Sequence, residues 1–204
     1  MKPARFITLE GVDGAGKSTH LRFIADAVAA ACGRPVIVTR EPGGTDLAER
    51  LRRAILEEPL DPMAETLLIF AARAHHVRNI IRPALEAGSW VVCDRFHDAT
   101  YAYQGAGKGV PAELIERLSE AAHAGLRPDR TLVFDCAYEV ARQRLSSAGK
   151  ALDRFEREDR AFFERVRDAY LARARAEPAR MRIIDAAADV ATIRRRLERE
   201  LDFS

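Results

Sequence analysis

The chain has 204 residues, of which 48% are hydrophobic and 31% charged, and its formal net charge is +2. This is the balance of a water-soluble globular protein that is long enough to bury a substantial core. The near-neutral charge does not indicate a nucleic-acid or membrane surface, so neither partner is expected. No apolar run is long enough to span a bilayer, and residues 1–11 lack the pattern of a signal peptide. With three cysteines far apart and no paired metal spacing, we expect a cytoplasmic protein whose cysteines stay reduced.

Hydrophobic periodicity predicts strands and helices that alternate along the chain. Short β-rich or wholly apolar runs predict five strands, at residues 5–10, 34–40, 89–94, 130–136 and 181–185. Helical spacing predicts seven helices, at residues 17–32, 45–57, 62–87, 111–124, 138–146, 154–176 and 189–201. We interpret 104–109 as a glycine-broken stretch and 146–153 as a small polar loop. The alternation predicts an α/β fold with a five-stranded parallel sheet and helices on both faces, formed by residues 1–204 as a single domain.

The stretch LEGVDGAGKSTH at 9–20 follows the first predicted strand and precedes the first predicted helix. It fits the phosphate-binding pattern G-x-x-x-x-G-K-[ST], in this context the mark of a P-loop. Glycines let successive backbone N–H groups turn toward phosphate oxygens, and the start of the helix adds its positive dipole end. Lys17 is expected to reach the β- and γ-phosphates of a nucleotide, and the Ser18 hydroxyl to bind Mg²⁺.

A P-loop alone leaves the class of protein open, because GTPases, motors, ATPases and kinases all use one. The chain contains no Asn-Lys-x-Asp sequence, so the usual guanine-reading element of GTPases is missing, and it is too small for a motor. These features favour a kinase that phosphorylates a small acceptor. A P-loop switch or binding module remains the alternative from a different class.

Further polar side chains follow the predicted strands at the edge where ligands bind in open α/β folds. REPGGT at 40–45 ends the second strand, and Asp94 and Arg95 end the third. Asp94 is predicted to support Mg²⁺, directly or through water, and Arg95 to bind phosphate. Arg52 is placed to hold an anion near the same edge. For Arg73, on a largely apolar helix face, the spacing leaves both a ligand contact and a structural ion pair open.

The sequence resembles the thymidylate kinase family, of the type with a lid arginine. The resemblance rests on six motifs, LEGVDGAGKST (9–19), TREPGGT (39–45), AARAHH (71–76), CDRFHDATYAYQG (93–105), DRFE (153–156) and IIDA (183–186). It implies a fold like that of P-loop nucleoside monophosphate kinases and transfer of the γ-phosphoryl group of ATP to dTMP, for dTTP synthesis. A kinase for another deoxynucleotide or deoxynucleoside is the alternative within the class. The resemblance also implies ATP and Mg²⁺ as cofactors and a homodimer.

The resemblance implies the following nucleotide-binding residues. ATP is expected to contact Gly11, Val12, Asp13, Gly14, Ala15, Gly16, Lys17, Ser18, Thr19 and, through the adenine, Arg144. The acceptor dTMP is expected to contact Asp13, Arg52, Phe70, Arg73, Arg95, Thr100, Tyr103 and Gln104. Within this set, Arg73 faces the thymine edge, and Tyr103 lies beside C2′, where it disfavours a ribose hydroxyl.

Two positions, Ile69 and Ala99, depart from the pattern of the family. The aromatic residue usual four positions before Arg73 is here Ile69, so either Phe70 turns in to stack on thymine or the base packs on an aliphatic side chain. Ala99 stands where relatives often have serine. The P-loop lacks the arginine that some members carry, so the lid at about 146–157 is expected to supply a catalytic cation. Candidates are Lys150, Arg154 and Arg157, with Arg154 favoured beside the catalytic residues Lys17 and Arg95.

Overall fold

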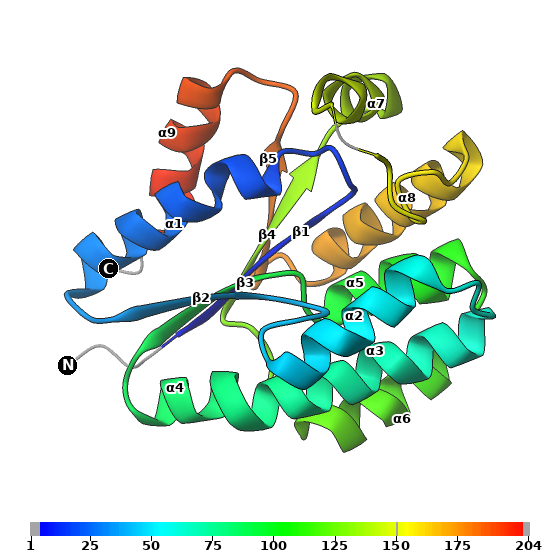
Figure 1. Cartoon of the computed structure of the whole chain (residues 1–204). Coiled ribbons are helices and arrows are strands. Elements are labelled where there is room, and N and C mark those ends of the chain that lie inside the picture. The colour runs from blue at the N-terminus through cyan, green and yellow to red at the C-terminus, as the bar shows by residue number, and fades with distance from the viewer. Residues whose placement is uncertain (1–4, 150, 202–204) are drawn as a thin grey trace.

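The computed structural model describes residues 5–149 and 151–201. Five parallel strands form one sheet in the order β2-β3-β1-β4-β5 (Figure 1). Their bounds are β1 Phe6–Gly11, β2 Val36–Arg40, β3 Trp90–Asp94, β4 Arg130–Asp135 and β5 Met181–Asp185. This confirms the predicted α/β class and the five-stranded parallel sheet. Strand β1 is buried along its whole length, as expected for a central strand covered on both faces.

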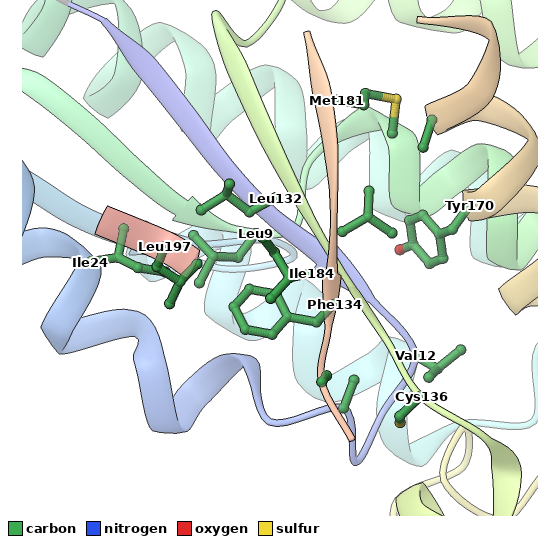
Figure 2. Close-up of a cluster of buried hydrophobic side chains, with 14 of the residues drawn as sticks. Leu9, Val12, Ile24, Leu132, Phe134, Cys136, Tyr170, Met181, Ile184 and Leu197 are labelled. Carbon is green, nitrogen blue, oxygen red and sulfur yellow. The ribbon is translucent and has the colours of Figure 1, made fainter. Parts of the chain in front are cut away.

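Helices cover both faces of the sheet. They are α1 Lys17–Cys32, α2 Asp46–Glu57, α3 Pro62–His76, α4 Arg82–Glu86, α5 His97–Thr100, α6 Ala112–His123, α7 Tyr138–Ser147, α8 Arg160–Ala176 and α9 Val190–Glu200. Helices α1 and α9 lie on one face, and α4, α5 and α8 pack on the other (Figure 1). Helix α2 packs on α3, and α3 packs on α6. The core lies between these layers, and Figure 2 shows side chains of α1, α9 and the central strands meeting in it.

The segment that the sequence suggested as a glycine-broken stretch is helical instead. Residues Tyr101–Gly107 form a π-helix, labelled η2, that continues α5. A Cβ built on Gly107 would lie 2.6 Å from the Phe162 ring of α8, and one on Gly105 would lie 3.2 Å from Ile115. These glycines therefore allow close packing against α6 and α8 rather than a turn. Single-turn π-helices occur frequently at functional sites.

One predicted helix start was wrong, and another predicted helix, confirmed over residues 62–86, contains a π-helical turn. The expected helix 62–87 is interrupted by a π-helical turn, η1 Val77–Ile81, where the Arg82 amide bonds to the Val77 carbonyl and Pro83 brings no N–H donor. The expected helix from residue 154 begins only at Arg160, where the Asp159 side chain accepts from the Phe162 amide. Before it, the Asp153 carboxylate accepts from the next backbone amides and holds the chain in turns.

The strand order places the site. Strand β1 lies between β3 and β4, with β2 and β3 on one side of it and β4 and β5 on the other. The strand order therefore reverses at β1, and a crevice opens there at the carboxyl ends of the strands. The P-loop follows β1. Asp94 is the last residue of β3 and Arg95 comes directly after it, and REPGGT begins at Arg40, the last residue of β2. All the polar clusters singled out in the sequence thus reach one edge of the sheet.

Candidate active site

The loop after β1 is built for close backbone approach. Gly11, Gly14 and Gly16 have φ of 127°, 81° and 91°, in the region that favours glycine. A Cβ on Gly11 would lie 2.3 Å from the Phe134 carbonyl oxygen, which no side chain could tolerate. The left-handed Gly16 begins α1 without a side-chain cap, so the first amides of α1 stay directed at the loop.

Lys17 lies buried under this loop. Its Nζ donates to the carbonyl oxygens of Gly11 and Val12 at 2.9 and 3.0 Å. Burial, and then the nearby Arg95, lower the pKa of Lys17 from its usual value. The amine is thus held against the backbone of the loop, and Lys17 lines the cleft over the loop.

An open cleft of about 540 Å³ lies over the loop. Its lining includes the donor-site residues Asp13, Gly14, Gly16, Lys17, Ser18, Thr19 and Arg144. Arg144 donates to the Ala186 carbonyl at 2.8 Å and to the Ala15 carbonyl at 3.5 Å, which fixes the guanidinium beside the loop. Seven of the ten residues predicted to bind ATP therefore line one cleft, whereas Gly11, Val12 and Ala15 are buried and do not line it.

Ser18 and Asp94 line the same cleft. Asp94 Oδ1 is buried, and within the described part of the chain it has no hydrogen-bond partner. The described residues include no cluster of three or more His, Cys, Asp or Glu side chains that could hold a metal ion. Mg²⁺ in nucleotide sites takes few protein ligands and completes its shell with phosphate and water, so one hydroxyl and one unpartnered carboxylate oxygen fit it.

A second cavity, of about 80 Å³, adjoins the cleft. Most of the residues predicted to bind the acceptor line it, namely Asp13, Arg52, Arg73, Arg95, Thr100, Tyr103 and Gln104. Phe70 is not among the lining residues, because it is buried against Val110 and Ile115. Ile69 lines the cavity in its place. Of the two alternatives left open, the aliphatic side chain is the one that faces this space.

Asp13, Arg95 and Tyr103 form a hydrogen-bonded group between the cleft and the cavity. Arg95 Nη2 donates to Asp13 Oδ1 at 2.5 Å and to the Tyr103 hydroxyl at 3.0 Å, and that hydroxyl donates to Asp13 Oδ2 at 2.8 Å. Burial alone would raise the pKa of Asp13, but Arg95 and Lys17 lower it to about 2. Arg95 has φ of 69°, an unusual conformation for a residue with a side chain. Nη1 of Arg95 also donates to the Gly11 carbonyl at 2.9 Å, which joins the group to the P-loop.

Arg73 is both a structural and a cavity-lining residue. Its Nε donates to Glu41 Oε2 at 2.6 Å, and its exposed fraction is 2% against 3% for Glu41. The other nitrogens donate to Thr100 Oγ1 and to the Phe96 carbonyl, each at 3.0 Å. His76 Nδ1 lies 2.9 Å from Glu41 Oε1, so this histidine also contacts the buried carboxylate. Glu41 was not predicted as a site residue. Its position directly after β2, at the ligand-binding edge of the sheet, is the sequence feature that could have indicated it.

The lid borders the acceptor cavity through Asp153 and Phe155. Arg154 Nη2 donates to the Ile55 carbonyl at 2.7 Å and forms an ion pair with Glu65. Arg157 Nε donates to the Leu152 carbonyl. Lys150 lies outside the described residues. A catalytic role for a lid cation stays a prediction, and Arg154 does not point at the P-loop here.

Glu10 beside the site gives a prediction for stability. Both of its oxygens accept hydrogen bonds, from the Phe96 amide at 2.8 Å and the Tyr170 hydroxyl at 2.7 Å. Burial, and then the charge of Asp98, raise its pKa from 4.5 to about 7. The folded protein therefore binds this proton more tightly than the unfolded chain, and the resulting stabilisation is lost as pH rises through about 7.

Replacement by glutamine removes that titration and keeps the shape. The stability of Glu10→Gln relative to wild type should increase between pH 5 and pH 8, by at most about 3 kcal/mol. Urea unfolding of both proteins at the two pH values measures this difference. A difference that is independent of pH would contradict the raised pKa.

Comparison with known proteins identifies the family. The family model for thymidylate kinase matches residues 9–197. The thymidylate kinase of Bordetella petrii is 55% identical over 197 residues, which are 97% of this chain and 94% of the relative. The chain belongs to the thymidylate kinase family. The thymidylate kinase of Cupriavidus necator is also 52% identical over 196 residues, 96% of each chain.

A solved structure agrees with this assignment. The crystal structure of thymidylate kinase from Ehrlichia chaffeensis matches with a TM-score of 0.79 and 32% identity, over 98% of this chain and 100% of that one. The family, the P-loop kinase fold and the activity expected from the sequence are thereby confirmed: the protein is a transferase of nucleotide biosynthesis that takes phosphate from ATP. In the part of the chain that the structure describes, helices are all too short or too polar to cross a membrane.

Proposed function

We propose that this thymidylate kinase transfers the γ-phosphoryl group of ATP to dTMP across the boundary formed by Asp13 and Arg95. The observation that carries the proposal is that these two side chains line both the P-loop cleft and the acceptor cavity. A donor phosphate in the cleft and an acceptor phosphate in the cavity would then meet at one guanidinium. Asp13 keeps that guanidinium in place.

Catalysis on this proposal rests on alignment and on neutralising charge. The acceptor phosphate is largely ionised near neutral pH, since its second pKa is about 6, so no strong general base is needed. Lys17 would bind the β- and γ-phosphates, and Arg95 and Arg52 the acceptor phosphate. Mg²⁺ supplies positive charge to the ATP phosphates, and Ser18 and Asp94 would hold it.

The test is the dependence of ADP formation on the acceptor. With ATP and Mg²⁺ present, purified protein should form ADP rapidly only after dTMP is added, with dTDP as the second product. EDTA should stop the reaction. A P-loop switch would instead hydrolyse ATP slowly with or without dTMP, and a kinase for another deoxynucleotide would prefer that acceptor.

Tyr103 is proposed to set the choice of sugar. Its ring lines the acceptor cavity and its hydroxyl is fixed by Asp13 and Arg95, so the ring cannot move aside for a 2′-hydroxyl. Tyr103→Ala should lower the ratio of kcat/KM for dTMP to that for its ribose analogue, and leave KM for ATP nearly unchanged. Steady-state kinetics with both acceptors measures the ratio. An unchanged ratio would mean that Tyr103 only packs in the core.

Thr100, Gln104 and Arg73 are proposed to read the thymine and sugar, with the base packed on Ile69. Arg144 is proposed to pack on the adenine. A lid cation from residues 146–157 is proposed to reach the transferred group, but Arg154 could do so only after leaving Glu65 and the Ile55 carbonyl.

A cytoplasmic homodimer is proposed as the form of the enzyme. Met63 and Leu67 support it, because they are large apolar residues exposed one turn apart on α3. Sedimentation equilibrium of the purified protein tests the dimer. A Met63→Glu/Leu67→Glu variant should shift it toward the monomer.

A further inference from the structure

Glu10 is a fully buried carboxylate near the end of β1, directly before Gly11 of the P-loop. Its Oε1 accepts from the Phe96 amide at 2.8 Å, and its Oε2 accepts from the Tyr170 hydroxyl of α8 at 2.7 Å. Glu10 itself lines neither the P-loop cleft nor the acceptor cavity. Any effect of this carboxylate on the substrates must therefore pass through its two partners.

The first partner leads to the backbone of Arg95. The Arg95 amide donates to the Leu9 carbonyl at 2.9 Å, and the next amide, that of Phe96, donates to Glu10. Both amides are thus bonded to β1, one through the backbone and one through a side chain. Arg95 has φ of 69°, and a residue with a side chain keeps such a conformation only where its surroundings fix it. Glu10 supplies one of the two bonds that do so.

The second partner leads to the guanidinium of Arg95. Tyr170 is 1% exposed, and its hydroxyl accepts from Arg95 Nη1 at 3.2 Å while it donates to Glu10. A hydroxyl carries one hydrogen, so the carboxylate takes that hydrogen and leaves the oxygen free to accept from Arg95. An amide at position 10 has only one oxygen and cannot accept from both Phe96 and Tyr170. The arrangement therefore depends on a carboxylate.

We propose that Glu10 is a positioning residue for the acceptor phosphate, because it holds the backbone and the guanidinium of Arg95 through Phe96 and Tyr170. Arg95 lines both the cleft and the cavity. The proposal rests on the proposed function, in which Arg95 binds the phosphate of dTMP. It follows that Glu10 and Tyr170 affect binding of the phosphate of the acceptor and not binding of its nucleoside.

The test compares the affinity for dTMP with that for thymidine, which lacks the phosphate. Titration calorimetry at pH 8 keeps Glu10 mostly ionised, since burial raises its pKa to about 7. Tyr170→Phe and Glu10→Gln should each raise Kd for dTMP by about fivefold and leave Kd for thymidine within about twofold of wild type. An equal rise for both ligands, or an unchanged Kd for dTMP, would overturn the proposal.

The matched control is Tyr138→Phe. It also removes a tyrosine hydroxyl, from a ring of α7 that packs on Phe163 of α8. Tyr138 lines neither the cleft nor the cavity, so both dissociation constants should equal those of wild type.

A second variant pair tests whether Tyr170 acts through Arg95. In an Arg95→Ala background, Tyr170→Phe should change Kd for dTMP by less than about twofold, because the guanidinium that it holds is gone. A further rise as large as that in wild type would overturn the proposal. If Arg95→Ala does not fold, the comparison of dTMP with thymidine in Tyr170→Phe, which loses a single hydroxyl, decides alone.

A third measurement needs no substrate. A guanidinium bonded at both Nη atoms rotates slowly about its Nε–Cζ bond, and NMR exchange between the Nη1 and Nη2 signals of Arg95 reports this rotation. The exchange should be faster in Tyr170→Phe and Glu10→Gln than in wild type and Tyr138→Phe, and unchanged exchange would overturn the proposal. If wild type forms no ADP with dTMP, the proposed function fails, and the exchange still decides whether Glu10 holds Arg95.

Discussion

Lys17→Ala is expected to abolish most turnover, lowering kcat by about 10²–10³, while the protein still folds. The ammonium is held by two carbonyl oxygens and lines the P-loop cleft, where on the proposed function it would meet the charge that develops on the transferring group. Loss of one such preorganised donor typically costs about 3–4 kcal/mol of transition-state stabilisation. The measurement is kcat at saturating ATP and dTMP, together with a thermal unfolding curve.

The matched control for Lys17→Ala is Arg22→Ala, which removes a cation from the exposed face of the same helix. It should leave kcat unchanged. If Lys17→Ala kept more than about a tenth of the wild-type kcat, the phosphate-binding role of Lys17 would be wrong.

Arg73→Ala is expected to destabilise the protein by about 3–5 kcal/mol, because it leaves the carboxylate of Glu41 buried without its main partner. The Thr100 hydroxyl and the Phe96 carbonyl lose their donors at the same time. Chemical unfolding measures the loss. A change below about 1 kcal/mol would show that the ion pair does not stabilise the fold.

The double variant Glu41→Gln/Arg73→Met separates stability from binding. It removes both charges and keeps an amide for His76, so it should recover much of the lost stability. If Arg73 also contacts thymine, KM for dTMP should stay raised in the double variant although the protein is stable. If both the stability and KM for dTMP returned toward their wild-type values, the role of Arg73 would be structural only.

The residues near the P-loop could be predicted because each follows a strand or a glycine motif in local sequence. Ser18, Asp94 and Arg95 reach one cleft through the sheet order alone, since parallel strands end at a common edge. The two partners of Arg154, by contrast, lie 99 and 89 residues earlier in the chain. Sequence spacing within the lid carries no information about such contacts, so neither partner of Arg154 could be predicted.

Glu41 and Glu65 were missed for a related reason. Glu65, Ile69, Ala72 and His76 repeat at helical spacing on the buried face of α3, so a carboxylate on this face indicates a buried partner as clearly as Arg73 did. The glycines of η2 were misinterpreted because periodicity does not distinguish a glycine needed for close packing from one needed for a turn. The helix expected from residue 154 failed because Asp153 and Asp159 each compete for backbone amides.

Asp13 and Arg95 line both the cleft and the cavity, so on the proposed function each substrate would contact side chains that also border the other. Binding free energies are state functions, so the factor by which bound ATP alters the affinity for dTMP equals the factor by which bound dTMP alters the affinity for ATP. The same reciprocity holds for any pair of ligands that fill the cleft and the cavity together, including the products ADP and dTDP. A compound that fills the cavity and engages Arg95 therefore reaches a side chain that also lines the donor cleft.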